Sequence, residues 1–218
     1  MAFTHRERVL AALDHREPDR VPTAICGGSY GIVDEIYLKL VDHFNLGEPV
    51  TPFRSGHSIS YMDDRLLDAL DTDIRYVFPN LMPNSPIETG NPANPLRDSF
   101  GQVWHKAVPY YFSGIGMLSN MKQDEDLDEY ITFPEPNDPK WMEGVGERAK
   151  QLRETTDCFI SMRMVSSHGP FQTACDLRGV ENFLIDMSLH EDFAVELLNR
   201  IADLQCSLVK EALRAGGD

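Results

Sequence analysis

The sequence is short of basic residues. It has 20 lysines and arginines against 35 aspartates and glutamates, a formal net charge of -15 over 218 residues. Binding to a nucleic-acid backbone depends on clustered lysine and arginine, and no basic run interrupts the acidic whole. This composition argues against a nucleic-acid partner.

Cysteine pairs, long apolar runs and phosphate-loop glycines are also missing. Cys26, Cys158, Cys175 and Cys206 are widely separated and include no C-x-x-C pair, so we expect reduced thiols rather than a disulfide framework. No apolar run reaches the roughly 18 residues that span a membrane. The first twenty residues carry charges throughout, unlike a signal peptide. The glycines of residues 27–31 match no nucleotide-binding pattern. We therefore expect a cytoplasmic protein without a membrane segment.

Helix and strand patterns alternate along the rest of the chain. Thr4 and Glu7 form a capping-box pattern, which predicts a helix with Val9, Leu10 and Leu13 on its apolar face. Further helices are predicted over 32–47, with Ile32, Ile36, Leu40 and Phe44 on one stripe, and over 61–73 and 141–157. Short apolar runs predict strands at 21–26, 74–80 and 158–166. Strands separated by helices indicate an α/β fold with parallel pairing.

The segment from residue 79 to about residue 140 has a different character. It holds nine of the fourteen prolines, and we interpret it as an insertion or lid within a single domain, with a possible hairpin over 100–113. After the third strand, residues 168–179 are predicted as a loop that leads into short helices.

A long helix is predicted near the end of the chain. Ser188 and Glu191 form a second capping-box pattern. The helix would run from about residue 189 to 214 with an apolar stripe of Phe193, Leu197, Ile201, Leu204, Leu208 and Val209. Three parallel strands would leave an open sheet edge, so we expect the 218 residues to be part of a larger fold.

Several segments, in the right order, resemble one known family. They are THRERVLAALDHREPDRVP (4–22), FGQVWHK (100–106), FPEPNDPKW (133–141), RETTDCFI (153–160) and HGPFQTACDLRGVENFLIDM (168–187). The chain resembles the uroporphyrinogen decarboxylase superfamily, in particular the branch of corrinoid methyltransferases and decarboxylase-like proteins. The resemblance implies that residues 1–218 are the N-terminal part of a (β/α)8 TIM barrel.

Two chemistries share that fold. True decarboxylases carry R-Q-A-G-R after the first strand, with arginines that hold carboxylates of the tetrapyrrole. This chain has Cys26, Gly27, Gly28 and Ser29 at that position. It also has Asn80 where the decarboxylases have an aspartate, and its residues 175–176 fall near their tyrosine. Tetrapyrrole decarboxylation in porphyrin biosynthesis is therefore the alternative hypothesis.

The favoured hypothesis is methyl transfer to or from a corrinoid. The methyltransferase relatives hold zinc through a His-x-Cys pair and a later cysteine, which keeps a thiol as the thiolate that accepts the methyl group. O-demethylating relatives use the metal to activate a methyl ether. These ligands map to the C-terminal half of the barrel, so the resemblance implies no metal ligand within this chain. Zinc, a corrinoid and a corrinoid protein as partner are expected for the intact protein only.

His168 is the candidate catalytic residue. It follows the third predicted strand, at the strand end where barrel active sites are built. It could form a hydrogen bond to the substrate or act as an acid or base. The alternative is a histidine that caps the next helix.

Five other residues are candidates for substrate binding. Arg54 and His57 lie on a glycine-containing loop and Asn80 follows the second strand, all near the expected barrel mouth. Cys175 and Asp176 complete the set, although the His-x6-Cys spacing is no standard zinc pattern. The structural alternatives are a buried cysteine at a helix start and an ion pair between Asp176 and Arg178.

These interpretations give three hypotheses about the protein. The intact protein is a methyltransferase or demethylase with a small-molecule methyl donor and acceptor, or it is a decarboxylase. The third hypothesis is a non-catalytic half-barrel that self-associates or pairs with a separate C-terminal half. In each case we expect the 218 residues alone to be inactive and to bind no cofactor.

Overall fold

The computed structural model describes residues 3–25, 31–52, 59–79, 96–97, 100–107, 110–113, 115–162 and 169–216. The chain divides into two compact units. The first unit comprises Met1–Pro79, Met142–Met164 and Ala212–Asp218, and the second comprises Asn80–Trp141 and Val165–Glu211. Each unit is described by itself.

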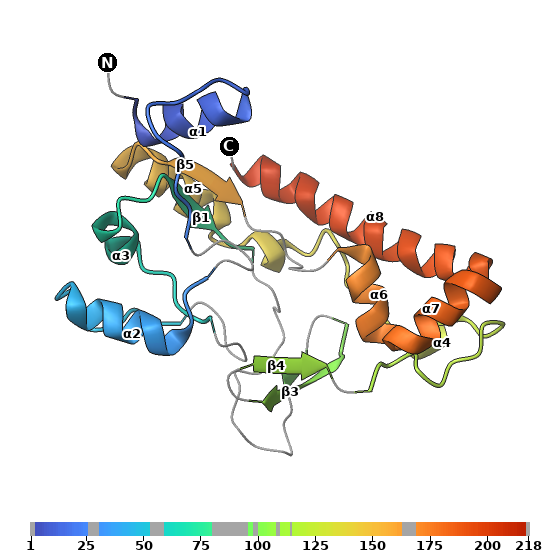
Figure 1. Cartoon of the computed structure of the whole chain (residues 1–218). Coiled ribbons are helices and arrows are strands. Elements are labelled where there is room, and N and C mark those ends of the chain that lie inside the picture. The colour runs from blue at the N-terminus through green and yellow to red at the C-terminus, as the bar shows by residue number, and fades with distance from the viewer. Residues whose placement is uncertain are drawn as a thin grey trace. The chain divides into compact units, whose positions relative to one another are not determined.

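The first unit is built on a pair of parallel strands, β1 (Ile74–Val77) and β5 (Phe159–Met162), with Ile74 opposite Phe159 and Val77 opposite Met162. Its helices are α1 (His5–Leu13), α2 (Asp34–His43), α3 (Asp64–Ala69) and α5 (Val145–Thr155) (Figure 1). The second and third predicted strands are thus present and pair in parallel. The mixture of helices and parallel strands confirms the α/β class, whereas the (β/α)8 barrel stays a prediction.

Helix α5 packs on the strand pair. Val145, Ala149 and Leu152 lie on one side of the helix and are almost completely buried against Val77 and Ile160. Their spacing of four and three residues gives a continuous apolar stripe. Burying an aliphatic side chain of this size contributes about 1.5–3 kcal/mol, so this contact fixes α5 on β1.

Helix α1 begins as predicted, and of its predicted apolar face only Val9 is buried. The Thr4 hydroxyl accepts a hydrogen bond from the Glu7 amide, and the Glu7 carboxylate accepts one from the Thr4 amide, which completes the capping box. Leu10 and Leu13 are 38% and 62% exposed, so their predicted burial is wrong. The helix instead buries Arg8, whose guanidinium has carboxylate partners outside α1.

Helices α2 and α3 share a small core of Tyr37, Val41 and Leu66. The predicted stripe is wrong at Ile36, which is 45% exposed. Tyr37 takes the buried position because its hydroxyl donates to the Asp63 carboxylate at 2.9 Å, so the ring can be buried without leaving a polar atom unsatisfied.

The first predicted strand is absent from the described part of segment 21–26. Residues 21–25 form no strand, and the Val21 side chain is 81% exposed. A single backbone hydrogen bond, from the Asp73 amide to the Thr23 carbonyl at 2.9 Å, joins this segment to the start of β1. Hydrogen bonds to the Asp73 carboxylate, rather than a ladder of backbone hydrogen bonds, attach this segment to β1.

The second unit contains an antiparallel sheet of β2 (Leu96–Arg97), β3 (Val103–Ala107) and β4 (Tyr110–Ser113). The pairing of β3 with β4 confirms the hairpin predicted over 100–113. The helices are α4 (Leu127–Tyr130), α6 (Pro170–Arg178), α7 (Val180–Leu189) and most of α8 (Glu191–Ala215), and η1 (Pro139–Met142) ends at the boundary of the unit.

Two helix boundaries differ from the sequence prediction. The loop predicted over 168–179 is wrong, because Pro170 occupies the first turn of α6, where a proline's missing amide costs nothing. The Ser188 capping box is also wrong, since Ser188 lies inside α7 and its hydroxyl donates to the Leu184 carbonyl. Helix α8 nevertheless follows the predicted range, and its stripe is buried at Phe193, Leu197, Ile201, Leu204 and Leu208.

A buried arginine organises the core of the second unit. The Arg178 Nε donates to the Asp186 carboxylate at 2.6 Å, and its Nη1 donates to the carbonyls of Leu118 and Met121. The predicted pair of Asp176 with Arg178 is therefore wrong. Residues two apart in a helix point in different directions, and Asp176 instead accepts a hydrogen bond from Gln172 at 3.0 Å.

No helix in the described ranges combines the length and the apolar character that crossing a membrane requires.

Candidate functional site

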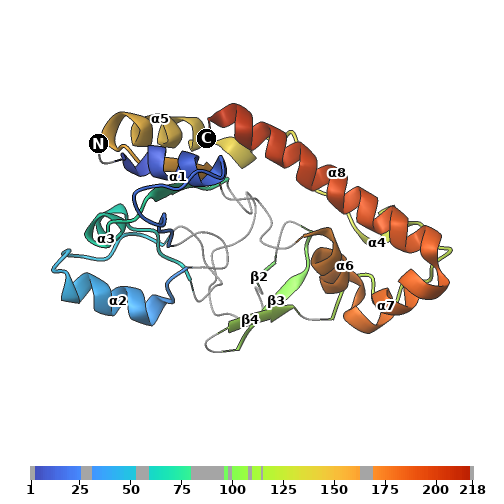
Figure 2. The same cartoon turned by 45° about the horizontal axis from the view of Figure 1, so that its top comes forward.

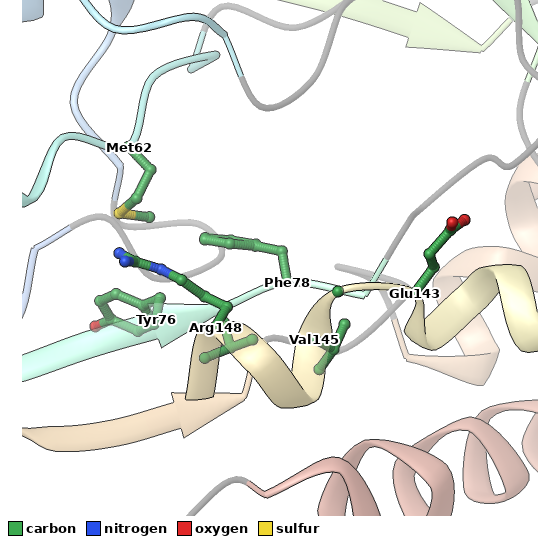
Figure 3. A pocket seen from close by; sticks show the side chains of 8 residues that line it. Met62, Tyr76, Phe78, Glu143, Val145 and Arg148 are labelled. Atoms are coloured by element: carbon green, nitrogen blue, oxygen red, sulfur yellow. The ribbon is translucent and has the colours of Figure 1, made fainter. Parts of the chain in front are cut away.

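A pocket of about 380 Å³ lies in the first unit (Figure 3). It is at the carboxyl end of β1 and the amino end of α5, and its lining consists of Met62, Tyr76, Val77, Phe78, Glu143, Gly144, Val145 and Arg148. Ligand sites in parallel α/β folds occur at the carboxyl ends of the strands. This position makes the pocket the candidate site.

One wall of the pocket is aromatic. Successive side chains of a strand point to opposite faces, so Val77 packs under α5 while Tyr76 and Phe78 share the other side. The ring centroids of Tyr76 and Phe78 lie 6.4 Å apart. Met62, which precedes α3, adds a thioether to this wall. The wall can shield an apolar ligand from water.

The charged groups of the pocket come from α5 and the turn before it. Arg148, in the first turn of α5, forms an ion pair with Asp64 at the start of α3, and its Nη1 donates to Gln151 at 3.2 Å. Glu143 stands just before the helix, where Gly144 adopts a left-handed φ of 74° and provides no side-chain cap. A helix amino end carries partial positive charge. The pocket therefore combines an apolar wall with charged groups of both signs.

A buried carboxylate fixes the other end of β1. Asp73 has no solvent exposure. It accepts hydrogen bonds from the Arg20 Nη1 at 2.6 Å and from the Thr23 amide at 2.7 Å, it is paired with Arg8, and the His5 Nδ1 lies 2.7 Å away. Burial alone would raise the pKa of Asp73, but these partners outweigh burial and lower the pKa to about 2.

The partners of Asp73 all come from the start of the chain. Arg8 also binds Asp19, with an Nε–Oδ1 distance of 2.6 Å, and this hydrogen bond is the main cause of a raised pKa for Arg8. His5, Arg8, Asp19 and Arg20 all belong to segment 4–22. Figures 1 and 2 show α1 beside the strand pair. Segment 4–22 is therefore bound to the amino end of β1 through Asp73, and the pocket is at the opposite end of the strand.

Four of the six predicted site residues lie outside the described residues: Arg54, His57, Asn80 and His168. Their proposed roles stay predictions. The other two, Cys175 and Asp176, are neighbours on α6 in the second unit.

Cys175 is a core residue in the middle of α6 rather than at its start. Its side chain is 3% exposed among apolar neighbours that include Phe183 and Leu197. Burial, and then the charge of Asp176, raises the pKa of the thiol. A thiolate is disfavoured here, which supports the packing alternative; the substrate-binding role of this pair stays a prediction. The described residues contain no group of three or more potential metal ligands.

The pocket residues were not among the sequence candidates. Phe78 could have been found, since it ends a predicted strand and such positions face a barrel mouth. Arg148 carries no comparable signal, because arginine on a charged helix is usually a solvated residue. Only the fold brings it beside Phe78.

No protein-family model matches the sequence, and no curated protein sequence matches it. Among solved structures, the chain is similar to a methyltransferase from Methanosarcina mazei, with a TM-score of 0.56 and 17% sequence identity. The similarity covers 99% of this chain and 57% of that structure, so the chain spans little more than half the length of its neighbour. At 17% sequence identity, the structural similarity shows a shared fold.

Proposed function

We propose that the protein acts in methyl transfer, as the N-terminal part of a barrel of the uroporphyrinogen decarboxylase type. The observation that carries the proposal is the structural likeness to a methyltransferase over 99% of the chain. The ordered sequence motifs and the pocket at the carboxyl end of β1 support it. Because the chain spans 57% of that structure, the activity is proposed for a protein that contains the full barrel.

In this proposal the chain binds and orients a small molecule. Tyr76, Phe78 and Met62 exclude water from one side of the pocket, and Arg148 provides a fixed positive charge at its edge. The Asp73 cluster holds the opposite end of β1 and takes no part in lining the pocket. Holding a reactant in one orientation is itself a large part of catalysis.

Zinc and a corrinoid belong to the proposal only for the full barrel. The described residues do not fit a zinc site, because they include no cluster of three ligands and because burial raises the pKa of the Cys158 and Cys175 thiols. A zinc-bound thiolate would require the opposite environment. We therefore assign no metal-dependent step to this chain.

The test is a methyl-transfer assay on the protein with its complete barrel. Reduced or methylated cobalamin is mixed with candidate methyl ethers or thiols, and the change in corrinoid absorbance is followed together with zinc content. Enzyme-dependent conversion is expected. A protein that shows no conversion, and no zinc after supplementation, contradicts the proposal. Carbon dioxide release from uroporphyrinogen would favour decarboxylation instead, and a larger mass in light scattering without either activity would favour the half-barrel hypothesis.

A further inference from the structure

The geometry points to a specific ligand class for the pocket of the first unit, and we propose that it binds a small monocarboxylate with an apolar body. Arg148 would take the carboxylate, and the wall of Met62, Tyr76 and Phe78 would take the apolar part. The inference rests on the proposed function, since it names the substrate class of the same site.

Arg148 has the chemistry to bind a carboxylate. A guanidinium carries five N–H donors in a planar fork that matches the two oxygens of a carboxylate. Two of its nitrogens donate to Asp64 and Gln151, and the remaining N–H donors have no partner within the described ranges. The Asp64 contact also restricts the side chain, so less entropy is lost when a ligand binds.

The guanidinium of Arg148 favours a negative ligand over a neutral one, because a hydrogen bond from an ionised donor to a carboxylate is stronger than one to a neutral acceptor. The ion pair with Asp64 occupies only part of the guanidinium fork. The side chain is about one-third exposed, so a small ligand can reach it. Burial of the ligand's apolar part against the aromatic wall would strengthen the charge interaction by excluding water.

The apolar wall restricts the ligand to one negative charge. Figure 3 shows Met62, Tyr76 and Phe78 beside Arg148 in the pocket lining. A ligand with carboxylates at both ends would place the second one against this wall, where it loses water and gains no hydrogen bond. The pocket should therefore prefer a monocarboxylate to a dicarboxylate of the same length.

The test compares three six-carbon probes on the wild-type chain: hexanoate, its neutral analogue hexanamide, and the dicarboxylate adipate. Binding is measured by NMR titration with no methyl donor or corrinoid present. Hexanoate should bind saturably. Hexanamide should bind at least about tenfold more weakly, the loss expected for a charge-assisted hydrogen bond. Adipate should also bind at least about tenfold more weakly, because its second carboxylate would be desolvated in the apolar part of the pocket. This comparison needs no variant and is independent of folding effects.

Variants then locate the site. Arg148→Gln should weaken hexanoate binding at least about tenfold, whereas Lys150→Gln removes the same charge from an exposed position of α5 and should leave it unchanged. Asp64→Asn distinguishes ligand binding by Arg148 from a purely structural role of its ion pair, because it breaks the ion pair but keeps the guanidinium. It should bind hexanoate as tightly as wild type or more tightly.

The inference is overturned if hexanoate does not bind saturably, if hexanamide or adipate binds equally well, or if Arg148→Gln binds normally. It is also overturned if Asp64→Asn loses binding as strongly as Arg148→Gln. Failure of the proposed function can be distinguished from failure of the proposed ligand class. Selective hexanoate binding without methyl transfer by the full barrel would refute the function alone, and methyl transfer without hexanoate binding would refute the ligand class alone.

Discussion

Replacement of Asp73 by asparagine tests whether the contacts of segment 4–22 with Asp73 stabilise the first unit. The side chain keeps its shape but loses its charge at a position with no solvent exposure. Arg8, Arg20, His5 and the Thr23 amide all lie within hydrogen-bond distance of the carboxylate. Asparagine offers one acceptor oxygen in place of two, so the buried Arg8 loses one of its two ionic partners and keeps Asp19.

The magnitude follows from the pKa of Asp73. It falls from an ordinary value of 3.8 to about 2, and each pKa unit corresponds to about 1.4 kcal/mol. The ionised carboxylate thus contributes about 2.5 kcal/mol. Removing one member of a buried pair costs about 3–5 kcal/mol when the other charge is left uncompensated. Here Arg8 keeps Asp19 and Arg20 keeps Asp71, so the loss should lie at the lower end of this range. We expect Asp73→Asn to lower the free energy of unfolding by about 3 kcal/mol at pH 7, or Tm by about 6–12 °C for a chain of this size.

The pH dependence has a defined sign. A carboxyl group whose pKa is depressed by folding stabilises the native state above its unfolded pKa, and it loses this effect as the pH falls through its native pKa. For Asp73 the loss occurs between about pH 4 and pH 2. The stability difference between the wild type and Asp73→Asn should therefore be full at pH 5 to 7 and should narrow as the pH approaches 2.

Urea unfolding followed by far-UV circular dichroism at pH 7, 5, 4 and 3 measures both effects. Asp14→Asn is the control, because Asp14 is 64% exposed and pairs only with Arg16 on the surface; its effect should stay within about 0.5 kcal/mol. The stabilising role of Asp73 would be refuted if Asp73→Asn lowered the free energy of unfolding by less than about 1 kcal/mol at pH 7. It would also be refuted if the stability difference between wild type and variant did not narrow at pH 3.

Two further predictions concern close packing and thiol burial. Gly116→Ala should destabilise the second unit by about 1–3 kcal/mol in urea unfolding, because its Cβ would lie 2.3 Å from the Leu177 carbonyl oxygen. Gly146→Ala in α5, whose Cβ would lie at an ordinary distance of 3.5 Å from the Ala215 carbonyl oxygen, should be neutral or stabilising, and equal effects of the two variants would count against this packing argument. Exposed Cys206 should be alkylated by iodoacetamide in the native protein, whereas Cys175 should react only on unfolding, since it is buried and its thiol pKa is raised; rapid native labelling of Cys175 in a peptide map would contradict this.

Local signals predicted the elements whose cause is local. The Thr4–Glu7 capping box, the strand at Ile74–Val77 and the stripe of α8 depend on residues close in sequence, and all three are present. Burial within α1 could not be predicted in this way. Arg8 displaces Leu10 and Leu13 from the interior because its partner Asp73 lies 65 residues further along the chain, and no periodicity reports such a pair.

Two local signals were misleading for identifiable reasons. Gly169 and Pro170 suggested a loop, but glycine and proline are also compatible with a helix start. Ser188 and Glu191 have the capping-box spacing, yet α7 extends through Ser188 because its hydroxyl bonds back to the Leu184 carbonyl. In both cases the same residues satisfy two local rules, and tertiary packing decides between them.

The segment that suggests a family and the pocket that suggests a ligand lie at opposite ends of β1. Asp73 and Phe78 are five residues apart, or about 16 Å along an extended strand, and the charge of Asp73 is compensated locally by Arg8 and Arg20. The Asp73 cluster can therefore hold β1 without setting the charge of the pocket. It follows that Asp73→Asn, wherever it remains folded, should leave the affinity for hexanoate within about twofold of wild type. The Asp73 cluster would then be compatible with many different pockets. A resemblance carried by segment 4–22 therefore indicates the fold of the protein, whereas its chemistry must be tested at Arg148.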